Sequence, residues 1–154
     1  MKPINQWLSE YGESHQNPTN KMVHFFCVPV IFFTIVGLFY CIPLYTFSPT
    51  FTLTLAHVVA VLVAVYYILL SIPLAIGMIL YSGLCLLLCG LIQQATGGYL
   101  LYVSIALFVI AWIFQFWGHK IEGKKPSFLK DLQYLMIGPA WIMSFLFKKI
   151  GLSV

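Results

Sequence analysis

The chain begins with an amphipathic segment and continues with long apolar runs that short polar stretches separate. Over residues 3–14, apolar side chains recur at the three- and four-residue spacing of a helix. These side chains belong to Ile4, Trp7, Leu8 and Tyr11. Because Glu10 and Glu13 fall on other faces, the pattern predicts a short helix that lies on a membrane surface.

Four apolar runs follow, each close to the ~20 residues that a helix needs to cross the hydrocarbon core of a bilayer. They cover residues 20–43, 51–71, 73–93 and 98–118. The stretches between them contain proline, glycine and glutamine, which interrupt apolar helices. A further apolar stretch over residues 128–147 is interrupted by Lys130, Asp131 and Gly138-Pro139. We expect that stretch to form an interfacial or re-entrant helix rather than a fifth crossing.

The composition agrees with a chain that is embedded in lipid. Of its 154 residues, 61% are hydrophobic and 8% are charged, whereas soluble domains carry about 25% charged residues. So few charges cannot cover a water-facing surface. We therefore expect one membrane-embedded domain over residues 1–154. Its fold class is all-α, with about four transmembrane helices, an N-terminal amphipathic helix and a C-terminal interfacial or re-entrant helix.

The placement of lysine predicts the orientation of the chain in its membrane. Two lysines precede the first apolar run and six follow the fourth, while the connections between the runs carry no charged residue. Lysine-rich segments stay in the cytoplasm, and four spans bring both termini to that side. Because the lysines flank apolar runs, membrane lipid is a better partner than nucleic acid. Residues 151–154 contain no retention signal, which favours a bacterial inner membrane; the alternative for a eukaryotic chain is the ER membrane.

Three of the four histidines lie at the predicted cytoplasmic ends of the apolar runs. His15 precedes the first run, His24 lies near its start, and His119 follows the fourth. The break at Asn17-Pro18 allows the chain to fold His15 back over His24. Converging imidazoles suit Fe(II) or Zn(II). The spacing therefore predicts a metal site at one membrane face.

Polar side chains accompany these histidines at helical spacing. Asn20 precedes His24 by about one turn and is expected to orient its ring by a hydrogen bond. Gln115, His119 and Glu122 fall within about 60° of one another around a helix. Asn20, Gln115 and Glu122 are therefore candidate catalytic or supporting residues. Glu122 could bind the metal or could hold a ligand in place, and both roles stay open.

Other interpretations of the same pattern remain open. His57 lies near the start of the second run, which enters from the opposite face, so we expect it to pack outside the site. A non-catalytic scaffold or channel would explain interfacial histidines without a metal. A protein that binds haem b or a quinone would use two of them. The apolar runs contain no acidic residue, so they do not indicate the ion relays of a coupled transporter.

Taken together, these positions resemble the 2-hydroxy fatty acid dioxygenase family, whose fungal member acts in the α-oxidation branch of phytosphingosine breakdown. The resemblance covers nearly the whole chain and is carried by His15…Asn20…His24 with Pro29, and by Gln115…Gly118-His119…Glu122…Pro126. It implies an Fe(II)-dependent membrane enzyme. Its substrates would be O₂ and a long-chain 2-hydroxy fatty acid, and its products CO₂ and the fatty acid one carbon shorter. It also implies that His15, His24 and His119 bind the iron.

Overall fold

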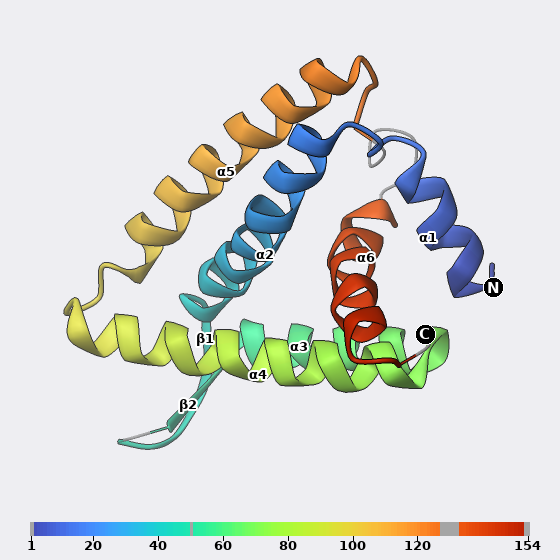
Figure 1. The fold of residues 1–154 in the computed structure, drawn as a ribbon. Helices are drawn as coiled ribbons and strands as arrows, with labels where there is room; N and C mark the ends of the chain where they lie inside the picture. Colours follow the sequence, from blue (N-terminus) through green and yellow to red (C-terminus); the bar gives the residue numbers. More distant parts are fainter. Residues whose placement is uncertain (1, 50, 127–132, 153–154) are drawn as a thin grey trace.

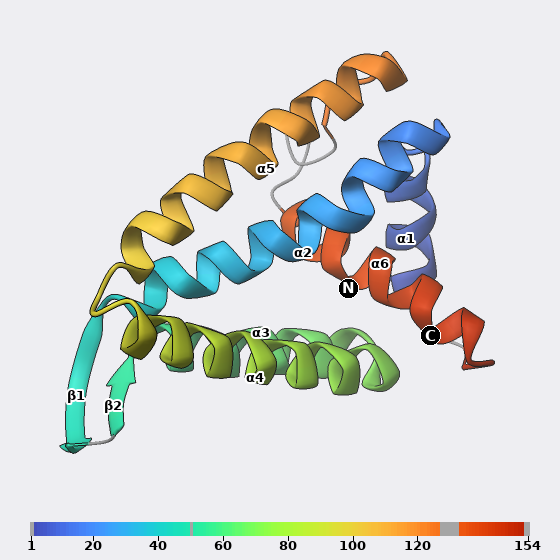
Figure 2. The ribbon, with the colours of Figure 1, turned by 60° about the vertical axis from the view of Figure 1, so that its left-hand side comes forward.

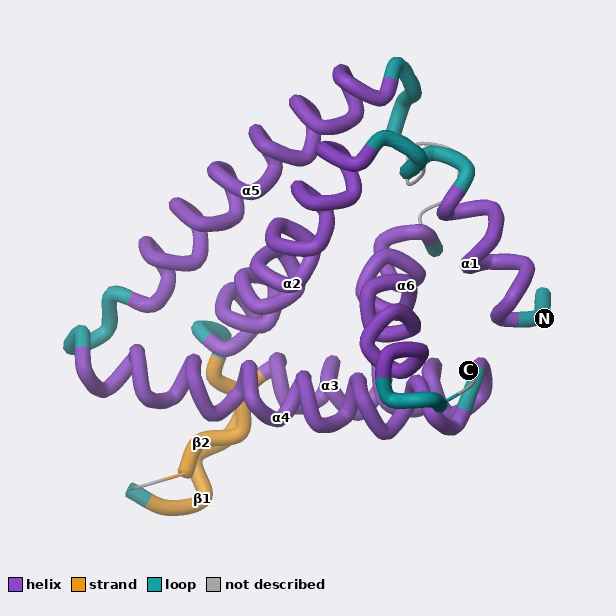
Figure 3. The backbone as a smooth tube through the Cα atoms, viewed as in Figure 1, coloured by secondary structure: helices purple, strands orange, loops and turns teal. Residues whose placement is uncertain are grey.

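The structure, a computed structural model, describes residues 2–49, 51–126 and 133–152. A body of helices carries one protruding hairpin of two strands (Figure 1, Figure 3). In chain order the elements are α1 (Ile4–Gly12), α2 (Pro18–Tyr40), β1 (Pro43–Ser48), β2 (Phe51–Thr54), α3 (Leu55–Leu70), α4 (Ile72–Ala95), α5 (Leu100–Glu122) and α6 (Tyr134–Lys149). The apolar body is helical, as predicted.

Among the described residues, three helices are long and apolar enough to cross a membrane, namely α2, α4 and α5. This result supports a membrane protein, but it does not show the fourth transmembrane helix that we expected. The predicted run over 51–71 is helical only from Leu55 to Leu70, which is 16 residues. A helix of that length extends about 24 Å, less than the ~30 Å of a hydrocarbon core.

The connection before α3 is a β-hairpin that the hydropathy pattern did not predict. Residues 51–54 form β2, which pairs antiparallel with β1. Both strands are rich in aromatic residues and threonine, which favour extended backbone. Across the pair, the Oγ1 atoms of Thr46 and Thr52 lie 3.1 Å apart. Two runs of this type around Ser48-Pro49 are a hairpin signal, and it outweighed apolar character alone.

Helices α3 and α4 pack against each other, and α4 ends on the side of the molecule where α3 begins, near the β-hairpin (Figure 1, Figure 2). Ser71 joins them with an extended backbone, φ −166°, and Pro73 lies at the start of α4. Because of this return, α5 packs beside α2 and runs in the opposite direction. We call the end where α2 starts and α5 stops the histidine end, and the other the hairpin end.

Glycines bring α2 and α5 into close contact. A Cβ atom on Gly118 of α5 would lie 2.6 Å from Oδ1 of Asn20 on α2. Towards the hairpin end, a Cβ atom on Gly37 of α2 would overlap the Ser104 hydroxyl of α5. Small residues are what allow membrane helices to approach this closely. This packing sets the separation of the two helices that carry His24 and His119.

Helix α1 is the predicted amphipathic segment over 3–14, but its apolar face packs on protein. Trp7 and Tyr11 are buried in one cluster with Ile137 and Trp141 of α6. We expected this face to rest on a membrane surface. The contact with α6 buries Trp7 and Tyr11 of this face, and whether the helix lies on a membrane surface stays a prediction.

Helix α6 corresponds to the predicted stretch over 128–147, of which residues 128–132 lie outside the described part of the chain. It is not among the candidate spans. All residues from Ile137 to Ile142 are buried, and the helix packs on α1, α2 and α4. Whether it is interfacial or re-entrant stays a prediction.

Candidate metal centre

A short loop between α1 and α2 carries His15 to the histidine end. Asn17 caps α2 by accepting hydrogen bonds at Oδ1 from the backbone N–H of Thr19, at 2.9 Å, and of Asn20, at 3.4 Å. Pro18 occupies the first position of the helix, where its missing N–H is not needed. The turn lies between His15 and His24 and folds one back over the other, as predicted.

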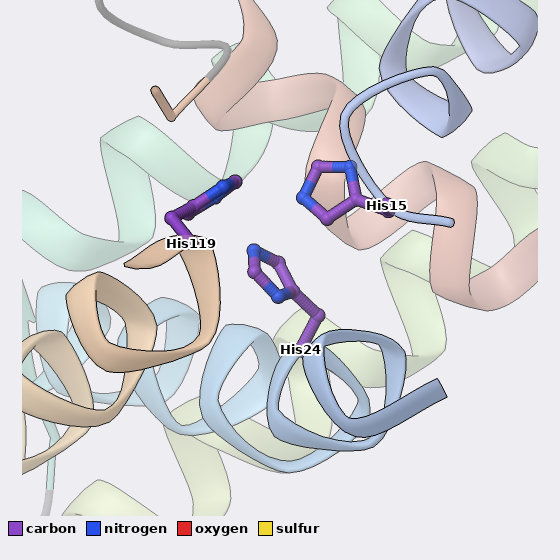
Figure 4. A group of neighbouring side chains, drawn as sticks. All are labelled: His15, His24 and His119. Carbon is purple, nitrogen blue, oxygen red and sulfur yellow. The ribbon is translucent and has the colours of Figure 1, made fainter. Parts of the chain in front are cut away.

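The three histidines at this end meet in a buried cluster (Figure 4). One ring nitrogen from each of His15, His24 and His119 lies within 4.8 Å of the other two. The ring centroids are 4.2 Å apart for His15 and His24, 5.0 Å for His15 and His119, and 4.8 Å for His24 and His119. None of the three side chains is more than 5% exposed. The predicted convergence is therefore present.

Backbone carbonyls orient two of the rings. Nδ1 of His15 lies 2.6 Å from the Tyr11 carbonyl, and Nδ1 of His24 lies 2.9 Å from the Asn20 carbonyl. A proton on each Nδ1 is donated to that carbonyl, which leaves the Nε2 lone pair for a ligand. We predicted a hydrogen bond between Asn20 and the His24 ring, and the acceptor is the backbone carbonyl of Asn20 rather than its side-chain amide.

The donor atoms of the cluster fit a metal ion. Among the described residues, His15 Nε2 and His119 Nδ1 are buried and have no hydrogen-bond partner. Buried polar nitrogens without partners are unfavourable, since they have lost water and gained nothing in exchange. A cation between the rings would satisfy both atoms. Three imidazole donors suit Fe(II), Zn(II) or a related divalent ion.

Burial also keeps the cluster in the state that binds metal. It lowers the pKa of His15 to about 4, because the charged imidazolium would lose its hydration. The ring is therefore neutral at neutral pH, as a metal ligand must be. Tyr11 stacks on it with 4.2 Å between centroids and 17° between planes. Burial raises the pKa of Tyr11, so its phenol stays protonated.

Glu122 ties the His15 loop to the end of α5. Its carboxylate accepts hydrogen bonds from the backbone N–H of Gln16, at 2.9 Å, and of Asn17, at 2.8 Å. It also accepts one from Nδ2 of Asn20, at 3.1 Å. The group of possible metal ligands does not include it. With its oxygens engaged in this way, Glu122 is better suited to hold the loop than to bind a metal.

The remaining candidates lie around the same cluster. The Asn20 side chain is fully buried and also donates to the Ser14 carbonyl at 3.2 Å. Gln115 is 5% exposed. With His24 and His119 it lines a cavity of about 50 Å³. Asn20 therefore holds the surroundings of the cluster, whereas Gln115 faces the space beside the rings.

His57 lies apart, at the start of α3. Its Nδ1 accepts a hydrogen bond from the backbone N–H of Thr54 at 3.1 Å and lies 2.9 Å from the Thr54 hydroxyl. This is a helix-capping arrangement, in which the side chain near the start of the helix satisfies a backbone donor. The expectation that His57 stands outside the metal site is consistent with this position.

Comparisons with known proteins show the family of the chain. A family model described as "2-hydroxy-palmitic acid dioxygenase Mpo1-like" matches residues 1–150. The chain belongs to the Mpo1-like family. A relative from Saccharomyces cerevisiae, the 2-hydroxy-palmitic acid dioxygenase MPO1, is 34% identical over 145 residues, which are 92% of this chain and 78% of the relative. No solved structure matches the chain.

Sequence reasoning missed some residues of the site in this Mpo1-like chain. Tyr11 and Trp141 both pack on His15, with centroid distances of 4.2 and 5.4 Å. Tyr11 precedes His15 by four residues, a spacing that could have signalled the contact. Trp141 lies on α6, and no local signal connects it to the loop. Gly118 was part of the motif, but its role as the close contact between α2 and α5 was not foreseen.

Proposed function

We propose that the chain is an iron-dependent dioxygenase that shortens long-chain 2-hydroxy fatty acids by one carbon. One 2-hydroxy acid and one O₂ would give the shorter fatty acid, CO₂ and water. Membership of the Mpo1-like family supports the substrate class and the dioxygenase chemistry. The observation that carries the proposal is the buried cluster of three histidine rings, two of which present nitrogens that lack a hydrogen-bond partner.

The proposed ligands of the iron are His15, His24 and His119. Zinc also binds imidazole but has no redox chemistry, and this reaction oxidises its substrate, so iron fits better. When bound, ferrous iron would activate O₂ beside the substrate. The protein contributes neutral, rigid donors, because burial keeps the rings uncharged and the carbonyls of Tyr11 and Asn20 fix two of their orientations.

The other predicted residues would hold the site and the substrate. Glu122 and Asn20 would act as positioning residues, since they bind the loop that carries His15. Gln115 lines the cavity next to two of the rings. Its amide Nε2 could donate to the substrate carboxylate, which fixes C2 near the metal. Tyr11 lines the same cavity and keeps its phenolic proton, so it is a second donor for the carboxylate or hydroxyl.

We also propose that the protein is an integral membrane protein with the histidine end and both termini in the cytoplasm. The lysines at the two ends of the chain support this orientation. The start of α2 and the end of α5 meet at the histidine end, which supports placing them on the same side of the membrane. The membrane would be a bacterial inner membrane, or the ER membrane in a eukaryote, and membrane lipid would surround the exposed apolar faces.

The test uses detergent-purified protein loaded anaerobically with Fe(II). 2-Hydroxyhexadecanoate and air are added, and pentadecanoate is measured by mass spectrometry together with iron per chain. Pentadecanoate that disappears in His15→Ala, His24→Ala and His119→Ala variants is the expected result. Iron at one per chain without product would contradict the substrate. A Soret band in the purified protein would indicate haem, and the absence of stoichiometric metal would favour a scaffold.

A further inference from the structure

A second, larger cavity lies deeper in the molecule, between α2, α3 and α6. Its volume is about 230 Å³. Among the described residues that line it, Ser82 alone is polar. Cavities lined by aliphatic and aromatic side chains stay dry, and one of about 150 Å³ is large enough to bind benzene. This cavity therefore suits an apolar ligand and not a charged one.

The apolar cavity adjoins the space beside the histidines. Ile31 of α2 and Leu135 of α6 line both cavities. Ile31 follows His24 by seven residues, or about two turns, and lies on the same face of α2. A ligand with a polar head among the rings could therefore continue past Ile31 and Leu135 into the apolar space.

The apolar cavity has the length of an acyl chain. Its wall on α2 runs from Val28 to Phe39, a separation of eleven steps along the helix and thus about 16 Å. One leaflet of a bilayer, formed by long acyl chains, is about half of the ~30 Å hydrocarbon core. The two lengths agree. The charged head would stay at the histidine end, and only the chain would enter.

The end of the cavity that is farther from the histidines lies near the start of α3, where Phe39 and Ala56 line it. Ala56 belongs to one buried cluster with Val36, against which Phe39 packs. Val63, further along α3, packs with Phe32 in a different cluster nearer the middle of α2. Ala60 lies between these two levels and also lines the cavity. Two small side chains, one turn apart, thus stand where the methyl end of a long chain would reach.

We propose that this cavity binds the acyl chain of the 2-hydroxy fatty acid, and that Ala60 and Ala56 set the longest chain that fits. The proposal rests on the proposed function and adds the binding site of the chain to it. It assigns chain-length preference to α3, an element that contributes nothing to the histidine cluster. Ala60 is nearer the histidines, so a larger residue there would exclude more of the chain than one at Ala56.

The first test compares kcat/KM for 2-hydroxyoctanoate and 2-hydroxyhexadecanoate in the iron-loaded protein. Ala60→Leu should lower kcat/KM for the C16 acid at least about tenfold, because one misfitted methylene in an apolar pocket already costs about that much. The value for the C8 acid should stay within about twofold. Ala56→Leu should penalise the C16 acid less than Ala60→Leu does. Ala106→Leu is the matched control, because Ala106 is exposed on α5.

Equal losses for both acids, or no loss for either, in Ala60→Leu would overturn the proposal. A second test does not depend on turnover. A 2-hydroxyhexadecanoate that carries a diazirine near its methyl end is photolysed with the protein, and the labelled peptides are identified by mass spectrometry. Label should fall on α2 and α3 around Phe39, Val59 and Ala60, and excess unlabelled acid should suppress it.

The two tests separate this proposal from the proposed function. If the wild-type protein oxidises no 2-hydroxy acid but the label enters the cavity and is suppressed, the proposed function fails and the acyl site stands. If the protein is active but the label falls on outward positions such as Val61 and Leu62, which are each 63% exposed, the acyl site fails. Label in the cavity that unlabelled acid does not suppress indicates ordinary lipid and also overturns the proposal.

Discussion

The two ends of the molecule both contain buried or half-buried histidine but use it in opposite ways. At the histidine end, His15 Nε2 and His119 Nδ1 are buried without a hydrogen-bond partner among the described residues. At the hairpin end, His57 uses Nδ1 to accept a bond from the Thr54 backbone and to contact the Thr54 hydroxyl. At the histidine end, ring nitrogens that could bind a metal lie close together, whereas at the hairpin end Nδ1 of His57 is hydrogen-bonded at the start of α3.

The difference shows that the presence of histidine is a weak guide to a metal site. What matters is whether a ring nitrogen keeps a lone pair that no hydrogen bond occupies. A carbonyl one turn away occupies Nδ1 of both His15 and His24 and leaves Nε2 available. At His57, by contrast, Nδ1 accepts a hydrogen bond from the Thr54 backbone, so its lone pair is not available to a metal. Substitutions at the two ends should therefore have different consequences for metal and for stability.

Replacing any of the three proposed ligand histidines should have the largest effect. His15→Ala, His24→Ala and His119→Ala each remove one of three donors, so iron affinity or activity should fall more than about 100-fold, beyond the loss typical for groups that only support a ligand. Iron per chain and pentadecanoate formation measure this. Retention of one iron per chain and of activity in all three variants would contradict the proposal that the histidine end binds iron and the hairpin end does not.

Removal of the Glu122 carboxylate, which accepts hydrogen bonds from the His15 loop, should have the second-largest effect. Glu122→Ala leaves the backbone N–H groups of Gln16 and Asn17 without their acceptor, and the His15 loop should loosen. Iron affinity or activity should fall about 10- to 100-fold, as for other groups that orient ligands. Titration of the apo protein with Fe(II) gives the affinity, and excess iron should partly restore activity. Glu13→Ala, at an exposed position on the same loop, is the control and should behave like the wild type.

Gln115→Leu should separate substrate binding from metal binding at the histidine end. A lost hydrogen bond to a charged group costs about 1.5–3 kcal/mol, so kcat/KM should fall about 10- to 150-fold. Bound iron should stay at one per chain, because Gln115 is outside the group of possible ligands. Loss of iron in this variant would mean that Gln115 supports the metal rather than the substrate.

The two close contacts between α2 and α5 allow a matched comparison of the ends. A methyl group at Gly118 meets the buried and hydrogen-bonded Asn20 side chain, whereas one at Gly37 meets the Ser104 hydroxyl. Each alanine variant should lose about 1–3 kcal/mol of unfolding free energy. Only Gly118→Ala should also weaken iron binding. Thermal unfolding in detergent and Fe(II) titration measure the two effects, and equal iron affinities would contradict the comparison.

The smallest effect is expected at His57. His57→Ala removes the bond to the Thr54 backbone and should lower the free energy of unfolding by about 1 kcal/mol, as for other helix-start residues. Iron content and product formation should stay at wild-type values. Thermal unfolding and the pentadecanoate assay check both statements. If this variant alone lost its iron, the metal would bind at the hairpin end rather than at the histidine end.

Much of the helical body could be predicted because hydropathy depends on local sequence. The expected runs over 20–43, 73–93 and 98–118 correspond to α2, α4 and α5, and Ser71 and Pro73 mark the α3–α4 boundary as expected. The run over 51–71 failed at its first residues. Apolar character does not separate a strand from a helix there, and pairing with β1 decided between them.

The site could be predicted in part for a related reason. The motif positions, with the expected return of the fourth apolar run to the side where the first begins, were enough to predict that His15, His24 and His119 meet at one end. The motif did not say that Glu122 would bind backbone N–H groups of the His15 loop, because those bonds link residues more than 100 positions apart. Nor did it indicate the face of α6 that packs on α1 and places Trp141 against His15.

The sequence by itself determined which segments are apolar, where the chain turns, and which residues have donor atoms for a metal. These properties depend on the local chain and on the cost of placing polar groups in lipid. Only the tertiary structure decided which nitrogens remain unpaired, that Trp7 and Tyr11 of α1 pack on α6, and that Ile31 and Leu135 line both the cavity beside the histidines and the apolar cavity. These features depend on side-chain packing between distant helices, which no local pattern specifies.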